Sequence, residues 1–150
     1  MKISVGIGDP KDPRTVALLT AHHSLMQSLF PAESNHFLSV DALSVPEITF
    51  LVASEGAQHL GCGALANKGS YGEIKSMFVS EAARGKGVAN LILTELISNA
   101  RASGLSKLYL ETGDSLRAAH ALYEKHGFTF CGPFGDYPDD PLSYFMELTL

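Results

Sequence analysis

The chain has 150 residues, of which 45% are hydrophobic and 18% charged, and its formal net charge is −5. This composition is typical of an ordinary globular domain and excludes a disordered chain. The acidic surplus argues against a nucleic-acid partner and is compatible with a cationic substrate. No apolar run approaches the roughly 18 residues of a membrane helix, and the first residues lack a signal-peptide stretch, so we expect a cytoplasmic protein without a membrane partner.

The first half of the chain is expected to contain one strand, two helices and three further strands. Pro13 can occupy the first position of a helix, and Pro31 and Pro46 mark the ends of helical regions. Alternating apolar residues and short connections favour an antiparallel arrangement of the last three strands. The predicted ranges are 3–7, 12–30, 35–43, 48–53, 59–66 and 73–79.

The second half alternates helical and strand patterns. Apolar residues recur at helical spacing after residue 88, and strand, helix and strand in succession predict a parallel pair with a right-handed crossover. The predicted ranges are 88–104, 108–112, 116–125, 128–131 and 144–150, with Asp114 or Ser115 capping the second helix. Residues 1–150 are therefore expected to form one α+β domain, with a mixed, mostly antiparallel sheet of six to seven strands and helices on both faces.

The segment from Arg84 to Ala89 carries the clearest chemical signal. Its sequence, Arg-Gly-Lys-Gly-Val-Ala, joins a predicted strand to an amphipathic helix. Glycines expose backbone N–H groups, and a helix N-terminus adds a positive dipole end, so the loop can bind an anion such as a pyrophosphate. No Ser or Thr follows Lys86 as a P-loop requires, and Asn90 replaces the third glycine of a dinucleotide fingerprint. A simple helix cap is the alternative.

Two motifs resemble those of the GNAT superfamily of N-acetyltransferases. Residues 84–89 match the pyrophosphate signature Q/R-x-x-G-x-G/A, and residues 119–128 resemble the later segment A-x-x-L-Y-x-x-x-G-F. The resemblance covers at least residues 73–131, and the order of the motifs is that of the family. It implies the GNAT fold, acetyl-CoA as cofactor and transfer of an acetyl group to an amine.

The resemblance also implies where the cofactor lies. The pantetheine arm would pair with the backbone of the strand that ends in Met77, Phe78 and Val79. The amides of Arg84, Gly85, Lys86, Gly87, Val88 and Ala89 would hold the pyrophosphate. Many relatives carry an asparagine seven residues before the tyrosine of the second motif, where this chain has Leu116, so Asp114 or Ser115 is the expected substitute in contact with the cofactor.

Tyr123 and Glu73 are the expected catalytic residues. A phenol is protonated at neutral pH and can give its proton to the leaving sulfur, and the resemblance places Tyr123 beside that sulfur. Glu73 begins the strand that leads to the cofactor, and a carboxylate there can take the proton of the amine, directly or through water. Glu111, at the end of the adjacent strand, is the competing base. A core position for Tyr123 and a solvated strand end for Glu73 are the structural alternatives.

Polar residues in two other regions are candidates for the acceptor site. His22, Glu33 and His36 lie in the region that forms one wall of the acceptor site in GNAT proteins, and Asp136 and Tyr137 lie in a long aromatic and acidic loop. Solvated surface positions are the alternative for each. No metal site is expected, because the adjacent residues His22 and His23 point apart on a helix.

Three functions remain open at this level. The first is an acetyl-CoA-dependent N-acetyltransferase that acts on the primary amine of a small molecule, with a homodimer as the expected assembly from the family. The second is an acetyl-CoA sensor without turnover, and the third is a protein or peptide N-acetyltransferase. The residues Tyr123 and Glu73 favour an enzyme over a sensor, because binding alone needs neither an acid nor a base.

Overall fold

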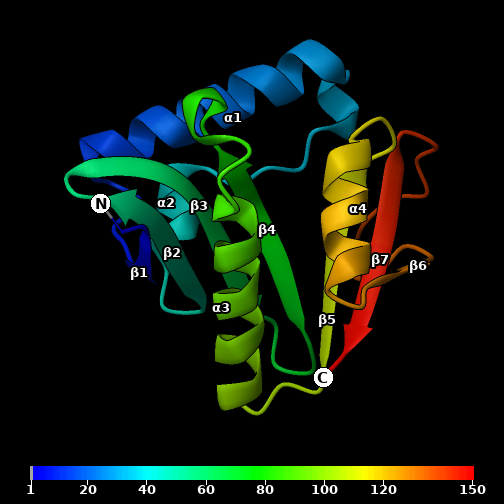
Figure 1. Ribbon diagram of the computed structural model, residues 1–150. Coiled ribbons are helices and arrows are strands. Elements are labelled where there is room, and N and C mark those ends of the chain that lie inside the picture. The colour runs from blue at the N-terminus through cyan, green and yellow to red at the C-terminus, as the bar shows by residue number, and fades with distance from the viewer. Residues whose placement is uncertain (1) are drawn as a thin grey trace.

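The computed structural model describes residues 2–150 and shows a seven-stranded sheet with the order β1-β2-β3-β4-β5-β7-β6 (Figure 1). Only β4 and β5 are parallel, and all other neighbours are antiparallel. The predicted mixed sheet and its single parallel pair are confirmed. The strands are β1 Ser4–Ile7, β2 Ile48–Glu55, β3 Gln58–Asn67, β4 Gly72–Val79, β5 Lys107–Gly113, β6 Thr129–Cys131 and β7 Ser143–Thr149.

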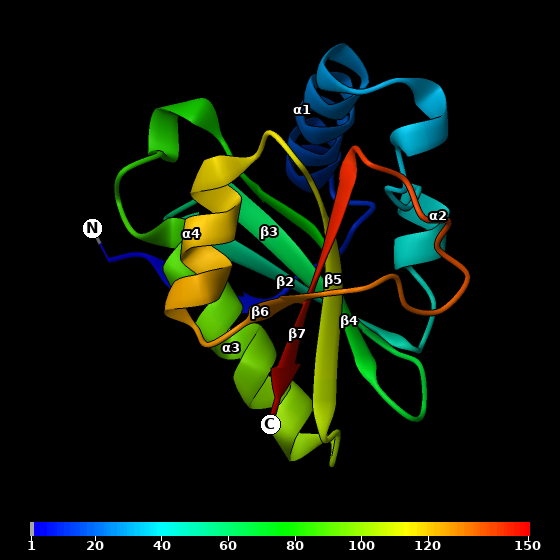
Figure 2. The same cartoon turned by 90° about the vertical axis from the view of Figure 1, so that its right-hand side faces the viewer.

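Helices cover both faces of the sheet, as predicted. Figure 2 shows α3 and α4 on one side and α1 and α2 on the other. The helices are α1 Pro13–Leu29, α2 Val40–Leu43, α3 Val88–Ala102 and α4 Arg117–Lys125, with short 3-10 turns at Ala32–Ser34 and Glu81–Ala83. Within residues 2–150, no helix is both long and apolar enough to cross a membrane.

Local signals account for the start of α1. The Asp12 carboxylate accepts a hydrogen bond from the Arg14 amide at 2.9 Å, and Pro13 occupies the first helical position, where its missing N–H costs nothing. The helix ends before Phe30, whose extended backbone precedes Pro31.

The predicted helix over residues 35–43 is wrong in extent, because only Val40–Leu43 is helical. The side-chain Nδ2 of Asn35 donates to the carbonyls of Phe30 and Pro31 at 3.2 and 3.1 Å, which holds this stretch in a turn. The His36 carbonyl accepts from the Lys75 ammonium at 2.8 Å, so that oxygen is not available to a helix. The segment between the turn and α2 is therefore without regular secondary structure.

The predicted cap of α4 is also wrong. The residue at the N-cap is Leu116, and no side chain closes this end of the helix. Neither Asp114 nor Ser115 takes that role. Since Ser115 and Leu116 both line a cavity, described below, the open end of α4 faces that space.

The sheet splits between β4 and β5 (Figure 1). The two strands pair only from Gly72 to Ile74 on β4, and β4 then continues to Val79 without β5. A bulge lies in the same stretch, because the register with β3 shifts there and Ser76 has a φ of 56°. A bulge bends and twists the strand that carries it. The bulge and the split together leave one backbone edge of β4 open.

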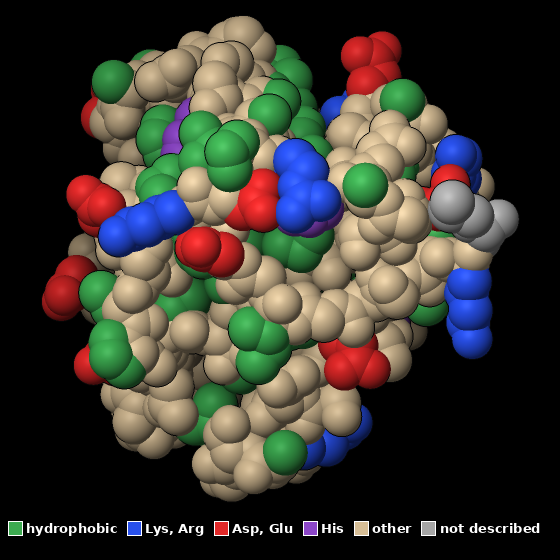
Figure 3. Space-filling view, turned by 90° about the vertical axis from the view of Figure 1, so that its left-hand side faces the viewer, with side chains coloured by type: hydrophobic (Ala, Val, Ile, Leu, Met, Phe, Trp, Pro, Cys, Tyr) green, Lys and Arg blue, Asp and Glu red, His purple; other side chains and the backbone are tan. Residues whose placement is uncertain are grey.

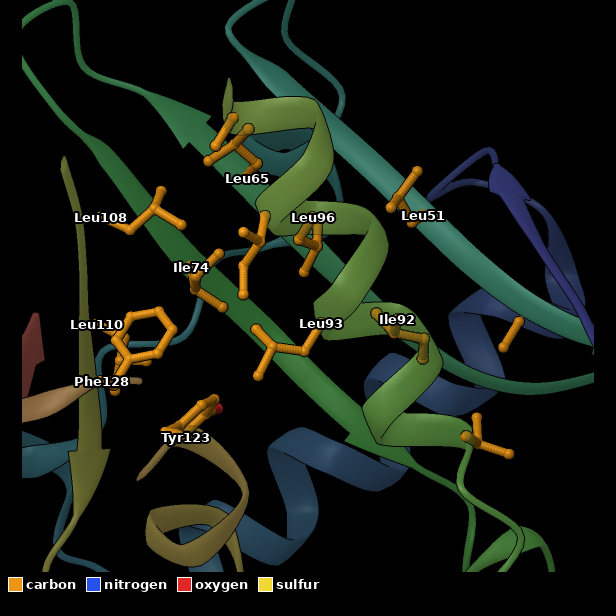
Figure 4. Packing of buried hydrophobic residues seen from close by; sticks show 14 of the residues in the cluster. Leu51, Leu65, Ile74, Ile92, Leu93, Leu96, Leu108, Leu110, Tyr123 and Phe128 are labelled. Atoms are coloured by element: carbon orange, nitrogen blue, oxygen red, sulfur yellow. The ribbon is translucent and has the colours of Figure 1, made fainter. Parts of the chain in front are cut away.

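The larger core lies between α3 and the sheet, and it reaches α4 through Tyr123 and Phe128 (Figure 4). The smaller core lies on the opposite face beneath α1 and α2. Acidic and basic side chains are interspersed on the face that Figure 3 shows, rather than gathered into one field of positive charge. The two cores thus lie on opposite faces of the sheet, and the larger one joins the strands on both sides of the split.

Leu93 and Leu91 offer a matched test of this packing on one helix. Leu93 is 0% exposed in the larger core and Leu91 is 40% exposed. We expect Leu93→Ala to lower the free energy of unfolding by about 2–5 kcal/mol, because it leaves a cavity in the core, and Leu91→Ala to lower it by less than about 1 kcal/mol. Urea denaturation of both variants measures this. Equal losses would contradict the packing of α3 described above.

Candidate active site

A cavity of about 810 Å³ occupies the space where β4 and β5 separate. Its walls come from α1 and the segment that follows it, the end of β4, the loop before α3, the end of β5 and the start of α4. One end meets the glycine loop and the other lies beneath α1. Segments that lie far apart in the chain thus line a single continuous cavity.

The loop before α3 has the geometry of an anion site. Gly85 and Gly87 have φ values of 82° and 76°, and a Cβ at either position would contact nothing within 4 Å. The left-handed backbone, rather than crowding, therefore explains the glycines. Gly87 is the N-cap of α3, and no side chain bonds to the first amides of that helix. Those amides and the positive end of the helix dipole remain available to an anion.

Most of the predicted cofactor-binding residues line this cavity. They are Met77, Phe78, Val79, Arg84, Gly85, Gly87, Val88, Ala89 and Ser115, whereas Lys86 is exposed and does not line it. Phe78 and Val79 pair with β3 along one edge, and the other edge lacks β5. The residues present therefore fit a pantetheine arm with its pyrophosphate, because an open strand edge adjoins an anion loop.

Tyr123 lies on α4, lines the cavity and is 6% exposed. Its ring packs against Phe128, with 5.8 Å between the ring centroids, and Figure 4 shows it directed from α4 toward Leu93. Burial raises the pKa of Tyr123, and the charge of Glu111 raises it further. The phenol is therefore protonated at neutral pH and available as a proton donor.

Glu73 is 4% exposed and does not line the cavity. Its Oε2 accepts a hydrogen bond from the Tyr137 hydroxyl at 2.5 Å and lies 3.5 Å from the Lys75 Nζ. Lys75 donates to the Tyr137 hydroxyl at 2.7 Å and to the His36 carbonyl at 2.8 Å. The structure thus brings two predicted residues, Glu73 and Tyr137, into one hydrogen-bonded cluster behind the cavity wall.

Glu111 lines the cavity one residue beyond Leu110, the last position of β5 that pairs with β4. Burial raises the pKa of its carboxyl group, while the Ser143 hydroxyl and the nearby His36 and Lys75 act in the opposite direction. The charge of Glu111 also acts on Tyr123, so the carboxylate lies within electrostatic reach of the phenol. Among the predicted site residues, Glu111 is the carboxylate that faces the cavity.

The acceptor end of the cavity is partly aromatic and partly polar. His22 and His36 both line it, and within the described chain His22 Nδ1 and His36 Nε2 are buried without a hydrogen-bond partner. Burial lowers the pKa of His22 to about 4, so its imidazole is neutral. The His22 ring lies 5.4 Å from that of Phe78, which joins this end to the cofactor strand.

Two other predicted acceptor residues lie away from this end. Glu33 and Asp136 are exposed and do not line the cavity. Tyr137 is half-buried, packs edge-on against His36 at 5.1 Å and reaches the site only through the Lys75 cluster. Among the described residues, no group of three or more His, Cys, Asp or Glu side chains could hold a metal ion.

Sequence reasoning missed Lys75 and the contact between Ser34 and Asp140. Lys75 lines the cavity and anchors the wall at His36, and its spacing of two residues from Glu73 on one strand was the available signal. The Ser34 hydroxyl donates to the Asp140 carboxylate at 2.5 Å and ties the acceptor wall to the last loop. No local signal links these residues, because they are separated by 106 positions.

Comparison with known proteins gives a consistent result. The model of the acetyltransferase (GNAT) family matches residues 17–128. An IAA acetyltransferase of Azospirillum brasilense is 43% identical over 150 residues, which cover 99% of this chain and 98% of that protein. The uncharacterized N-acetyltransferase YsnE of Bacillus subtilis is 43% identical over 149 residues, covering 97% of this chain and 99% of its own.

A solved structure agrees with the fold. A Klebsiella pneumoniae protein described as an acyl-CoA N-acyltransferase superposes with a TM-score of 0.82 at 29% identity, covering 99% of this chain and 97% of that one. The family match spans more than half of the chain and includes both the glycine loop and Tyr123. The chain therefore belongs to the GNAT acetyltransferase family and is an acyltransferase that uses acetyl-CoA.

Proposed function

We propose that the protein transfers an acetyl group to the primary amine of a small molecule, by direct attack while both substrates are bound. The observation that carries this proposal is the single cavity that runs from an anion loop to a polar and aromatic end beneath α1. Both reactants can meet there without a covalent acetyl-enzyme stage. Holding two reactants in one site lowers the barrier by removing the entropy cost of their encounter.

The cofactor end of the cavity follows from the backbone. The amides of Gly85 to Ala89 and the dipole of α3 would hold the pyrophosphate, and the open edge of β4 at Met77 to Val79 would hold the pantetheine arm. When bound, acetyl-CoA supplies an activated acetyl thioester. A backbone N–H of the Met77 to Val79 segment would stabilise the negative charge that develops on the carbonyl oxygen.

Tyr123 would act as the general acid. Its raised pKa keeps the phenol protonated, so it can give a proton to the sulfur as that atom leaves. Tyr123 lines the same cavity as the anion loop and lies within electrostatic reach of Glu111, which fits this step. A module that only senses acetyl-CoA needs no proton donor, and Tyr123 therefore favours an enzyme over a sensor.

The acceptor end favours a small molecule over a peptide. It lies beneath α1 and the segment 34–37, and that segment is tied to the last loop by Ser34 and Asp140. A peptide would need an open groove along the surface, whereas these contacts close one side. The family match leaves the acceptor open, and the Azospirillum brasilense relative is named for IAA.

Calorimetric titration with acetyl-CoA, followed by an acceptor panel with thiol detection, tests this function. The panel contains small primary amines, peptides with free N-termini and IAA. We expect acetyl-CoA binding and thiol release with at least one small amine. Binding without release across the panel would favour a sensor, and release with peptides alone would favour a peptide acetyltransferase. Release with IAA and with no amine would overturn the amine assignment.

A further inference from the structure

Two carboxylates are candidates for taking the proton of the acceptor, one on β4 and one on β5. A primary amine is protonated at neutral pH and has no lone pair until it loses a proton. A base must lie within hydrogen-bond reach of that proton, directly or through one water. Glu73 and Glu111 differ in this respect, because only Glu111 lines the cavity.

Glu73 is engaged by internal partners. The Tyr137 hydroxyl donates to its Oε2, and the Lys75 ammonium lies 3.5 Å from the same atom. Lys75 in turn holds the acceptor wall through the His36 carbonyl. A buried ammonium needs an opposite charge nearby, and Glu73 supplies it. The structure thus gives Glu73 a positioning role, as the counter-ion of the residue that anchors the wall.

Glu111 lines the cavity where β4 and β5 stop pairing. It follows Leu110, the last residue of β5 that pairs with β4, so the edge of β5 toward β4 is open beside it. Its surroundings combine His36 and Lys75 on the acceptor side with Tyr123 on the cofactor side. A carboxylate between the acceptor wall and the proton donor is placed to meet an ammonium group as it approaches the thioester.

Beside these polar groups, four apolar side chains line the acceptor end. Leu25, Met26 and Phe30 come from α1 and its end, and Phe37 comes from the segment that follows. Burial of apolar surface here favours a substrate with an apolar body. A second cationic group on the substrate would lose hydration water where it lay against these apolar side chains, which is unfavourable.

We propose that Glu111 binds the ammonium group of the acceptor and takes its proton, and that the acceptor is a primary amine on an apolar or aromatic body. This inference rests on the acetyl transfer proposed above. The base is then on β5 rather than on the neighbouring strand β4, which carries the Glu73 favoured from the sequence. Glu73 is left as a positioning residue.

The protons balance as follows. Glu111 takes one proton from the ammonium, which frees the nitrogen lone pair. The nitrogen forms a bond to the acetyl carbon as the bond from that carbon to sulfur breaks, and Tyr123 gives its proton to the sulfur. The second proton of the nitrogen returns to the Tyr123 oxygen, directly or through water. Glu111 releases its proton to solvent, so the products are the amide, the free thiol and one proton.

The pH dependence has a defined sign. Burial raises the pKa of Glu111, and protonated Glu111 cannot accept a proton. The value of kcat/KM should therefore fall as the pH drops. The midpoint of this fall should lie at a higher pH than the pKa of an ordinary glutamate. The other charged or titratable groups that face Glu111 are Glu73 and Lys75 on β4, His36 on the acceptor wall and Tyr123 on α4. The acidic limb should disappear in Glu111→Gln.

The test compares Glu111→Gln with Glu73→Gln on two matched amines, phenethylamine and its β,β-difluoro analogue. Fluorination lowers the basicity of the amine, so a larger fraction of the analogue is already neutral in solution. Its acetylation therefore depends less on a base in the enzyme. We expect Glu111→Gln to lower kcat/KM about 100-fold for phenethylamine but less than about 10-fold for the analogue. Glu73→Gln should affect both amines equally, because a positioning residue does not act on the proton.

Three further readouts make the outcome decisive. Acetyl-CoA titration and thermal unfolding of both variants separate loss of chemistry from loss of the cofactor site or of the fold. Absence of acetyl-CoA binding by the wild type would overturn the proposed function rather than the choice of base. An unchanged phenethylamine rate in Glu111→Gln, or selective rescue of Glu73→Gln by the fluorinated amine, would overturn the role of Glu111. A higher kcat/KM for putrescine than for phenethylamine would overturn the apolar acceptor class.

Discussion

Tyr123→Phe is expected to lower kcat on the order of 100- to 1,000-fold and to change the Kd for acetyl-CoA less than about three-fold. The substitution removes one hydroxyl from a ring that is buried against Phe128, so the packing of α4 persists. What is lost is the proton given to the departing sulfur. A loss confined to kcat identifies an interaction that matters in the transition state and not in cofactor binding.

Steady-state thiol release and calorimetry on the same preparation measure these two quantities. Tyr144→Phe is the matched control, because Tyr144 is 43% exposed on β7 and does not line the cavity. It should retain wild-type kcat. If Tyr123→Phe also retained wild-type kcat, Tyr123 would be a core residue and the proton would reach the sulfur from water.

The fold was largely predictable because its signals are local. Proline and Asp12 mark the start of α1, apolar spacing marks α3, and short connections identify the antiparallel strands. The extent of α2 was not predictable, because the carbonyl of His36 is taken by Lys75, which lies 39 positions away. Helix propensity alone cannot anticipate such a tertiary hydrogen bond.

The candidate site divides in the same way. The anion loop is contiguous in sequence, so its glycines and the helix that follows could be recognised without the structure, which adds that Gly85 and Gly87 are left-handed. The choice between Glu73 and Glu111 depends on which carboxylate faces the cavity. The cavity opens where the sheet splits, and Glu73 is engaged by the hydroxyl of Tyr137, which lies 64 positions away in the chain. Alternation along a strand indicates which residues share a face but not which internal donors will engage them.

Gly87→Asp is expected to weaken acetyl-CoA binding at least about 100-fold, which corresponds to roughly 2.7 kcal/mol. Gly87 is the N-cap of α3, and the space around a Cβ there is open. The carboxylate would therefore fit sterically, but it would place a negative charge beside the amides that receive the pyrophosphate and would itself bond to them.

Gly87→Asn is the control that separates charge from backbone strain. Asparagine has nearly the same shape as aspartate and tolerates the left-handed backbone, so both variants share the strain of a φ of 76° and the capping ability of the side chain. We expect Gly87→Asn to retain binding within about ten-fold of the wild type, since it adds no charge.

Calorimetric titration of both folded variants measures the difference. Because strain and capping cancel between them, a large gap can arise only from charge, and it would locate the anion at the start of α3. Equal and nearly wild-type affinities would instead place the pyrophosphate elsewhere in the cavity and leave the glycines as a turn that caps a helix.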